Sequence, residues 1–210
     1  MDCKIIGNDI QHLAVTLYPG EEFFAEKGAL IYLEAGIERD VELNGRGFLG
    51  ILGAKFSGES VFIIRYFNNC NMPRKLVVGS KMGLLPVSIS GESLICRVGS
   101  YVGSNKKVDI HTRLSLSGFV GGMGARLQKI SGVSTIFLDT IGSPIVVDLR
   151  QGDAIEVDED HIVALHGINE SQLVPGWSLK NAFGGEGLSM MRILGPGKVY
   201  LSPSSSEIII

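Results

Sequence analysis

Two short elements recur three times in the same order, and this repetition constrains the fold more than any other feature of the sequence. The first element is a glycine followed at once by an acidic residue, found as Gly20-Glu21, Gly91-Glu92 and Gly152-Asp153. Each leads to a further turn position, at Gly28, Gly99 and Asp160. The second element holds two glycines eight residues apart, as Gly50 and Gly58, Gly124 and Gly132, and Gly187 and Gly195. Two elements that keep their order three times predict an internal threefold repeat.

The repeated glycines indicate turns, because a glycine beside an acidic residue closes a tight turn between strands at little steric cost. The chain has 28 glycines in 210 residues, roughly twice the average usage, which agrees with many turns. No single repeat can bury its apolar face alone, so we expect the three repeats to share a core. The sequence therefore predicts one compact domain over residues 1–210 with pseudo-threefold character, with repeats at approximately 10–83, 84–144 and 145–203 and a tail at 204–210.

Short alternating or apolar runs lie between the turns, and the clearest alternation extends from Val108 to Ser117. Alternation puts apolar side chains on one face and polar ones on the other, as a half-buried strand requires. The other runs are Ala14 to Leu17, Leu30 to Leu33, Ser60 to Tyr66, Thr135 to Leu138, Ile145 to Leu149, Ile162 to Leu165 and Lys198 to Leu201. Many short strands separated by turns predict an all-β fold of packed antiparallel sheets, similar to a sandwich or a double-stranded β-helix.

Charge, cysteines and termini favour a cytoplasmic protein. The formal charge of −3 is unlike the basic surface that binds nucleic acid or anionic membranes indiscriminately. Cys3, Cys70 and Cys96 form no CxxC pair, which argues against a zinc cage and a redox dithiol. The chain starts without a basic segment followed by a long apolar one, and no apolar run is long enough for a membrane helix, so we expect neither a signal peptide nor a transmembrane segment.

Three motifs resemble those of the altered-inheritance-of-mitochondria number twenty-four family, a prokaryotic family of unknown function. Residues 17–32 resemble its "PGE…AE.GA…Y" opening, residues 57–62 resemble "SGES.F", and residues 184–201 resemble the "GGEG…GPG.VY" ending. Residues 47–55 depart from the glycine-rich stretch usual before "SGES". The resemblance spans nearly the whole chain. It implies a fold similar to the tryptophan RNA-binding attenuation protein and self-assembly through β surfaces, and it brings no catalytic residue.

The residues give little support to a catalytic or cofactor site, and we predict no cofactor. The glycines at 184–187 are followed by a predicted strand and lack the Gly-Lys-Ser/Thr sequence, so they favour a turn over a phosphate loop. The four histidines form no His-x-His pair, and the acids at 153–160 lack the spacing of a calcium loop, so no metal site is predicted. The serines of the repeated turns lie in no Gly-x-Ser-x-Gly elbow.

These observations favour a non-enzymatic protein that acts through self-assembly or protein binding, and we expect a homo-oligomer. The alternatives are a small-molecule-binding protein or enzyme, with a pocket between repeats drawn from His111, Arg113, His161 and Trp177, and an RNA-binding protein, by fold analogy alone. Nucleic acid is the least favoured partner, because the basic clusters lack interleaved aromatic residues. The apolar tail residues Ile208, Ile209 and Ile210 are expected to add an edge strand or to form a subunit contact.

Overall fold

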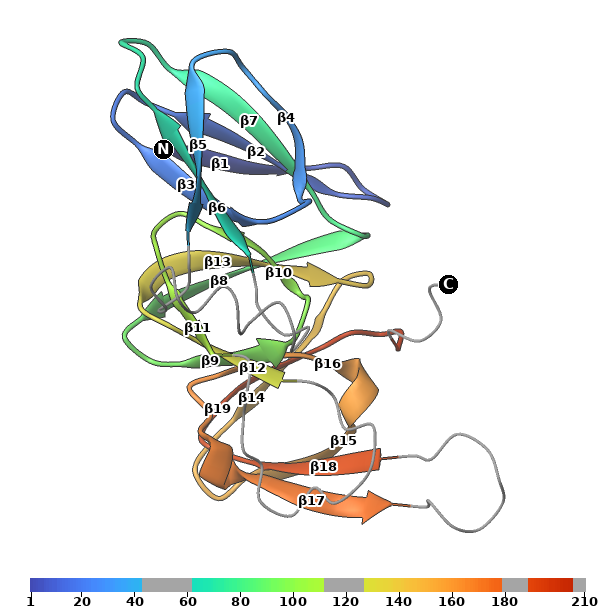
Figure 1. The fold of residues 1–210 in the computed structure, drawn as a ribbon. Coiled ribbons are helices and arrows are strands. Elements are labelled where there is room, and N and C mark those ends of the chain that lie inside the picture. The colour runs from blue at the N-terminus through green and yellow to red at the C-terminus, as the bar shows by residue number, and fades with distance from the viewer. Residues whose placement is uncertain (43–61, 112–126, 179–188, 206–210) are drawn as a thin grey trace, which may run out of the picture.

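The computed structural model describes residues 1–42, 62–111, 127–178 and 189–205, and these residues form β-strands with two short 3-10 turns (Figure 1). The turns are η1 (Glu159–His161) and η2 (Glu170–Gln172). The prediction of an all-β protein built from packed antiparallel sheets is confirmed. The likeness to the fold of the tryptophan RNA-binding attenuation protein stays a prediction.

Successive strands fall into three groups along the chain, which we call the first, second and third strand sets. The first set is β2 (His12–Leu17), β3 (Glu22–Glu26), β4 (Leu30–Leu33), β5 (Ile37–Glu42), β6 (Ile63–Asn68) and β7 (Arg74–Gly79), with β1 (Asp2–Ile6) added beside β2. The second set is β8 (Gly83–Ser90), β9 (Leu94–Arg97), β10 (Tyr101–Ser104), β11 (Asp109–His111), β12 (Leu127–Ser131) and β13 (Val133–Thr140). The third set is β14 (Ile145–Leu149), β15 (Ala154–Asp158), β16 (Ile162–His166), β17 (Leu173–Ser178), β18 (Ser189–Leu194) and β19 (Gly197–Leu201).

The strands of each set pair by the same scheme, always antiparallel. The first strand pairs with the sixth, the second with the fifth, the third with the sixth and the fourth with the fifth. This regularity is one of strand pairing between backbones, and it is separate from repetition of the sequence. The predicted repetition of sequence over 10–83, 84–144 and 145–203 stays a prediction, because Gly50, Gly58, Gly124 and Gly187 lie outside the described residues.

Two junctions join the sets into continuous sheets. The second strand of one set pairs with the third strand of the next, as β3 with β10 and β9 with β16. Each junction completes a six-stranded sheet, ordered β5-β6-β3-β10-β13-β8 and β11-β12-β9-β16-β19-β14. The terminal sheets are smaller, with the orders β1-β2-β7-β4 and β15-β18-β17. The sheets follow one another along the long axis of the molecule, from β7 at one end to β17 at the other (Figure 1).

The burial of each strand follows from how many of its faces are covered. Leu13, Val15 and Leu17 of β2 are buried while the residues between them are not, so β2 turns one face to the core. In β3 the three consecutive residues Phe23, Phe24 and Ala25 are buried, as expected for a central strand with packing on both faces. Burying one such large apolar side chain is worth about 1.5–3 kcal/mol, so the central strands dominate the stability.

Three apolar clusters form the core, and the junction strands contribute to two clusters each. Phe24 of β3 packs in the cluster of the second set, and Val102 of β10 packs in the cluster of the first set. The second junction repeats the exchange, because Ile95 of β9 packs in the third cluster and Val163 of β16 in the second. Each six-stranded sheet therefore has one core on either face.

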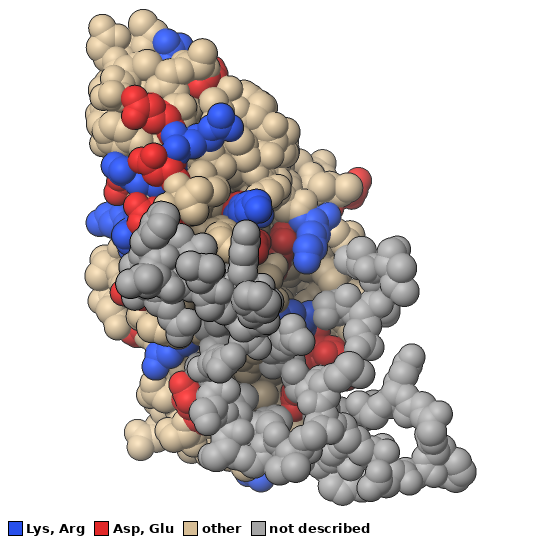
Figure 2. All heavy atoms as spheres, in the orientation of Figure 1, with Lys and Arg blue, Asp and Glu red and all other residues tan. Residues whose placement is uncertain are grey.

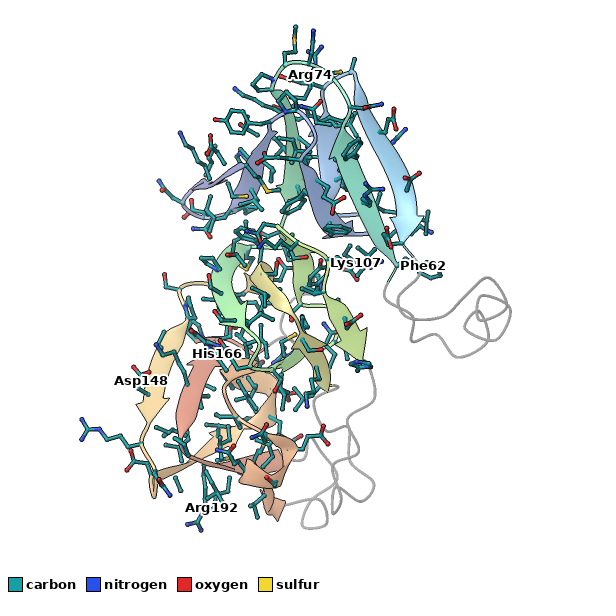
Figure 3. All side chains as sticks on the ribbon, turned by 90° about the vertical axis from the view of Figure 1, so that its left-hand side faces the viewer. Phe62, Arg74, Lys107, Asp148, His166 and Arg192 are labelled. Atoms are coloured by element: carbon teal, nitrogen blue, oxygen red, sulfur yellow. The ribbon has the colours of Figure 1, made fainter. Side chains whose placement is uncertain are left out.

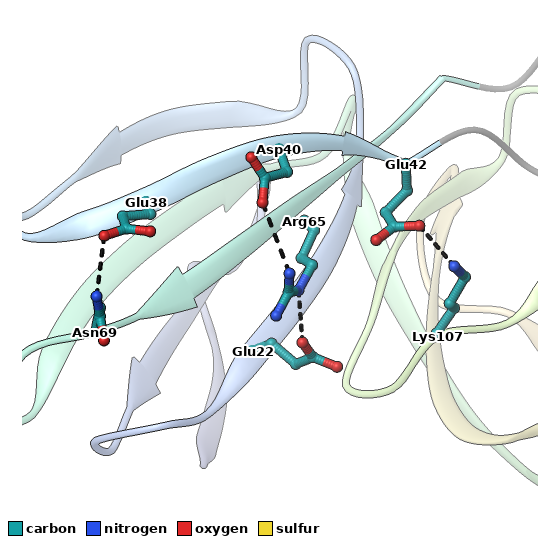
Figure 4. A network of polar contacts seen from close by, with 7 residues as sticks. All are labelled: Glu22, Glu38, Asp40, Glu42, Arg65, Asn69 and Lys107. Atoms are coloured by element: carbon teal, nitrogen blue, oxygen red, sulfur yellow. Dashed lines mark hydrogen bonds and ion pairs between the residues drawn. The ribbon is translucent and has the colours of Figure 1, made fainter. Parts of the chain in front are cut away.

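Charges of both signs are interspersed over the face in Figure 2, and several of them form ion pairs. Arg65 Nε lies 2.6 Å from Glu22 Oε2, and its guanidinium also reaches Asp40 Oδ2 at 3.6 Å (Figure 4). Lys107 Nζ, from the loop after β10, lies 2.6 Å from Glu42 Oε2 of β5, which links the second set to the first. Exposed pairs of this kind stabilise a fold by about 1 kcal/mol or less, so they assist the register of the sheet more than its stability.

Candidate functional site

Strand β4 is an unpaired sheet edge whose central residues are apolar and exposed. Among the described strands it pairs with β7 alone, and no described strand lies beside it on the side away from β7. Ile31 is 61% exposed and Tyr32 is 51% exposed. The strands in the same place of the other two sets, β10 and β16, are paired on both sides, and all four residues of β10 are buried. The exposure of β4 therefore marks a missing neighbour.

Strand β15 is the complementary edge at the other end of the chain of sheets. Its one partner in the part of the chain that the structure describes is β18, and Ala154 and Glu156 are exposed. β15 is the second strand of the third set, as β3 and β9 are of the first and second sets. On the side where β15 has no described partner, β3 pairs with β10 and β9 pairs with β16. The first set thus lacks a described partner for the outer side of β4, and the third set lacks one for the outer side of β15.

The two edges face away from each other along the long axis. Figure 1 places β4 near one end and β15 near the other, and Figure 3 shows Arg74 of β7 and Arg192 of β18 at these opposite ends. Since β7 and β18 are the neighbours of the two edges, one chain cannot pair its own β4 with its own β15. A pairing of these edges requires two molecules.

The backbone of β4 leaves hydrogen-bonding groups free on its outer side. Glu34 N donates to Lys75 O at 2.9 Å, so this N–H points inward to β7. Successive N–H groups of a strand point to opposite sides, and Leu33 therefore presents its N–H and carbonyl to the open side. Soluble proteins usually protect such an edge with lysine, proline or a bulge pointing outward. The sequence of β4, LIYL, holds neither lysine nor proline. Its bulge between Leu30 and Tyr32 recurs at the same place in β10 and β16, which are paired on both sides, so the bulge does not block pairing.

The interior junctions show what a completed edge looks like chemically. At the first junction the Tyr101 hydroxyl lies 2.8 Å from Ser104 Oγ and 3.4 Å from the carbonyl oxygen of Phe24, and burial raises the pKa of Tyr101. At the second junction burial raises the pKa of the Cys96 thiol to about 11. These groups are dry and structural, and neither is poised for nucleophilic chemistry.

The residues predicted to line a pocket fall on different elements. His111 lies exposed on β11, and His161, in η1, has its Nδ1 2.7 Å from the carbonyl oxygen of Ser202, a bond that ties η1 to the end of β19. Trp177 lies on β17, but its side chain and all of Arg113 lie outside the described residues. The pocket between repeats therefore stays a prediction.

The glycines predicted to form turns have the backbone geometry of turns wherever they are described, with one exception. The set with positive φ comprises Gly20, Gly28, Gly91, Gly99, Gly132 and Gly152. Gly195 is the exception. Its φ is not positive, and a Cβ there would collide with the carbonyl oxygen of Arg150, so close approach of two chain segments explains the glycine. The tail residues Ile208, Ile209 and Ile210 lie outside the described residues.

The described part of the chain holds neither a metal-ligand cluster nor a membrane-spanning helix. Within 1–42, 62–111, 127–178 and 189–205, no three His, Cys, Asp or Glu side chains come together as metal ligands. None of the helical elements in those ranges has the length and apolar character needed to span a bilayer. Among the described sheet edges, β4 and β15 are distinguished by their counterparts β10, β16, β3 and β9, which are all paired on both sides.

The comparisons with known proteins identify a family and a fold. No curated protein matches the chain. An X-ray crystal structure of a Streptococcus pyogenes protein is similar, with a TM-score of 0.71 and 19% sequence identity over 98% of this chain and 94% of that one. Identity at this level shows the fold alone. The family described as "Mitochondrial biogenesis AIM24" matches residues 3–204. The chain belongs to this AIM24 family, as its three sequence motifs predicted.

Proposed function

We propose that this protein is a non-enzymatic assembly protein that associates with copies of itself through its sheet edges. The observation that carries the proposal is the exposure of Ile31 and Tyr32 on an edge strand whose outer side has no partner among the described strands. An apolar, uncharged edge attracts another strand, because pairing satisfies its backbone groups and removes apolar surface from water.

Self-association is favoured over nucleic-acid binding by the charges on the surface. Acidic and basic side chains alternate on the face in Figure 2, whereas a single-strand binder needs a continuous basic groove with stacking aromatic residues. The net charge of −3 acts in the same direction. RNA binding by analogy with the fold has no residue-level support of this kind.

The test compares the oligomeric state of three proteins by size-exclusion chromatography with light scattering. We expect the wild-type chain to form a homo-oligomer. An Ile31→Lys/Tyr32→Lys double variant should be a monomer, since two charges on β4 prevent pairing. Val146→Lys is the matched control, because Val146 is 48% exposed on β14, the edge of a different sheet. It should leave the oligomer unchanged. A wild-type monomer at every concentration would refute the proposal.

A further inference from the structure

The interior junctions provide a template for the contact between copies, because both have the same register. At the first, Gly103 lies opposite Ala25 and Ser104 opposite Phe24. At the second, Ala164 lies opposite Cys96 and Leu165 opposite Ile95. Counted from the turn positions before the strands, the pairs are equivalent: the first partner lies four residues after Gly99 or Asp160, the second five after Gly20 or Gly91.

The same count can be applied to the two open edges. Strand β4 follows Gly28 and β15 follows Gly152, so the equivalent residues are Tyr32 and Val157. Given the self-assembly proposed above, on which this inference rests, we infer that β15 of one molecule pairs antiparallel with β4 of a second copy. Tyr32 then lies opposite Val157, Leu33 opposite Glu156 and Glu34 opposite Ile155.

Burial at the interior junctions explains why a second copy fits this edge. Val102 and Val163 pack into the core of the preceding strand set, and Ile31 holds the same place on β4, where it is exposed. In the assembled pair Ile31 packs against the third core, at the open edge beside Val157. The exposed apolar surface of β4 thus lies at one end of the molecule, and the third core, which has no following strand set, lies at the other end.

Glu156 is the one charge at the centre of the contact. Its interior counterparts Phe24 and Ile95 are buried in the core of the following set. The residues opposite these three positions on the neighbouring strand are all cationic, being Arg65, Lys129 and Arg192. The carboxylate of Glu156 therefore enters the contact with Arg192 beside it, and its aliphatic stem covers Leu33. Replacing Glu156 with isoleucine removes the desolvation cost and should tighten association about tenfold.

The contact is head-to-tail, because it joins two different surfaces at opposite ends of the molecule. A heterologous contact of this kind closes into a ring when its rotation permits and otherwise propagates into a filament. Every copy in a ring has both edges paired, which leaves neither β4 nor β15 open.

Cysteine cross-linking tests the register directly. Leu33→Cys and Glu156→Cys are placed in separate molecules in which Cys3 and Cys70 are replaced by serine and buried Cys96 is kept. Residues opposite each other on antiparallel strands have Cα atoms about 4.5–5.5 Å apart, within disulfide range. After mild oxidation, we expect covalent dimers in the equimolar mixture and none with either variant alone. Leu33→Cys mixed with Val146→Cys is the control for random collision and should give no dimer.

The outcomes separate this inference from the proposed function. An oligomer that cross-links in the control mixture, or through Leu33→Cys alone, overturns the β15–β4 pairing while self-assembly stands. Oligomers that form without any cross-link between positions 33 and 156 overturn it equally. A chain that sediments as a monomer overturns both.

Discussion

Strands β4 and β10 occupy the same place in the pairing scheme, yet one is exposed and the other buried. The sequence of β4, LIYL, is more apolar than YVGS of β10, so composition would predict the opposite. The difference lies in the neighbours: β10 is held between β3 and β13, whereas β4 has β7 alone. The exposure of β4 therefore reflects the lack of a described strand on its outer side, and not its composition.

The same comparison explains the residues at equivalent positions. Gly103 of β10 lies so close to β3 that a Cβ would stand 2.7 Å from both the Phe24 carbonyl oxygen and the Phe23 ring. Tyr32 is the counterpart on β4, where the open side leaves room for a large ring. The two strands that are paired on both sides thus carry a small residue at this position, Gly103 or Ala164, whereas β4 carries Tyr32.

The largest expected effect comes from adding a side chain at the crowded position. Gly103→Ala should lower the free energy of unfolding by about 1–3 kcal/mol, because the backbone of β3 or β10 must shift. Tyr32→Ala on β4 should change it by no more than about 0.5 kcal/mol in the dissociated chain. Urea unfolding of both variants at low protein concentration measures the difference. Equal effects would contradict the crowding of Gly103 by β3 as the cause of the difference.

An intermediate effect is expected from removing a buried hydroxyl at the first junction. Tyr101→Phe removes the group that lies 2.8 Å from Ser104 Oγ and should cost about 1 kcal/mol of unfolding free energy. Tyr18→Phe is the control, because the Tyr18 hydroxyl donates to Asp2 Oδ2 on the surface, where water can replace it. Thermal unfolding compares the two, and a Tyr101→Phe variant as stable as the control would contradict a structural role for this hydroxyl.

The smallest effect concerns the pH dependence of the carboxyl group on β3. Burial, assisted by the charge of Asp139, raises the pKa of Glu26 above its ordinary value of 4.5. Between the two values the folded protein binds more protons than the unfolded chain, so the contribution of Glu26 to stability increases as pH falls from neutral towards 4.5.

Glu26→Gln removes this proton uptake. The stability of the wild type relative to Glu26→Gln should therefore rise as pH falls, measured by urea unfolding at several pH values between 4.5 and 7. Glu38→Gln serves as the control, since Glu38 is an exposed residue of β5. A wild-type advantage that stays constant over this range would show that Glu26 titrates normally.

The sequence predicts the strands well and the open edges not at all. The apolar runs from Ile145 to Leu149 and from Ile162 to Leu165 appear as β14 and within β16, because alternation and β-branched residues are local signals. Nothing local distinguishes Leu30 to Leu33 from Ile162 to Leu165, although the two central residues of the former are exposed and all four of the latter are buried. That difference depends on strand pairing between residues about 70 positions apart, which a single sequence does not encode in a readable pattern.

Residues of a functional site are harder to predict from this sequence than turns are. Of the described glycines predicted to form turns, all but Gly195 have positive φ, which is the conformation that glycine adopts at least cost. His161 is predicted to line a pocket between repeats, and its imidazole Nδ1 lies 2.7 Å from the Ser202 carbonyl oxygen. Counting residues from Gly28 and Gly152 gives the register of the open edges only when it is known which strands pair. The sequence alone does not show that pairing.

The central claim is that the chain completes its open edges with copies of itself. Native mass spectrometry of the full chain tests it most directly, across a range of protein concentrations and without added ligand. The account predicts a homo-oligomer with a mass that is a whole multiple of 22.5 kDa, and a single species if the head-to-tail contact closes into a ring. A chain that remains at the mass of one copy throughout would contradict it.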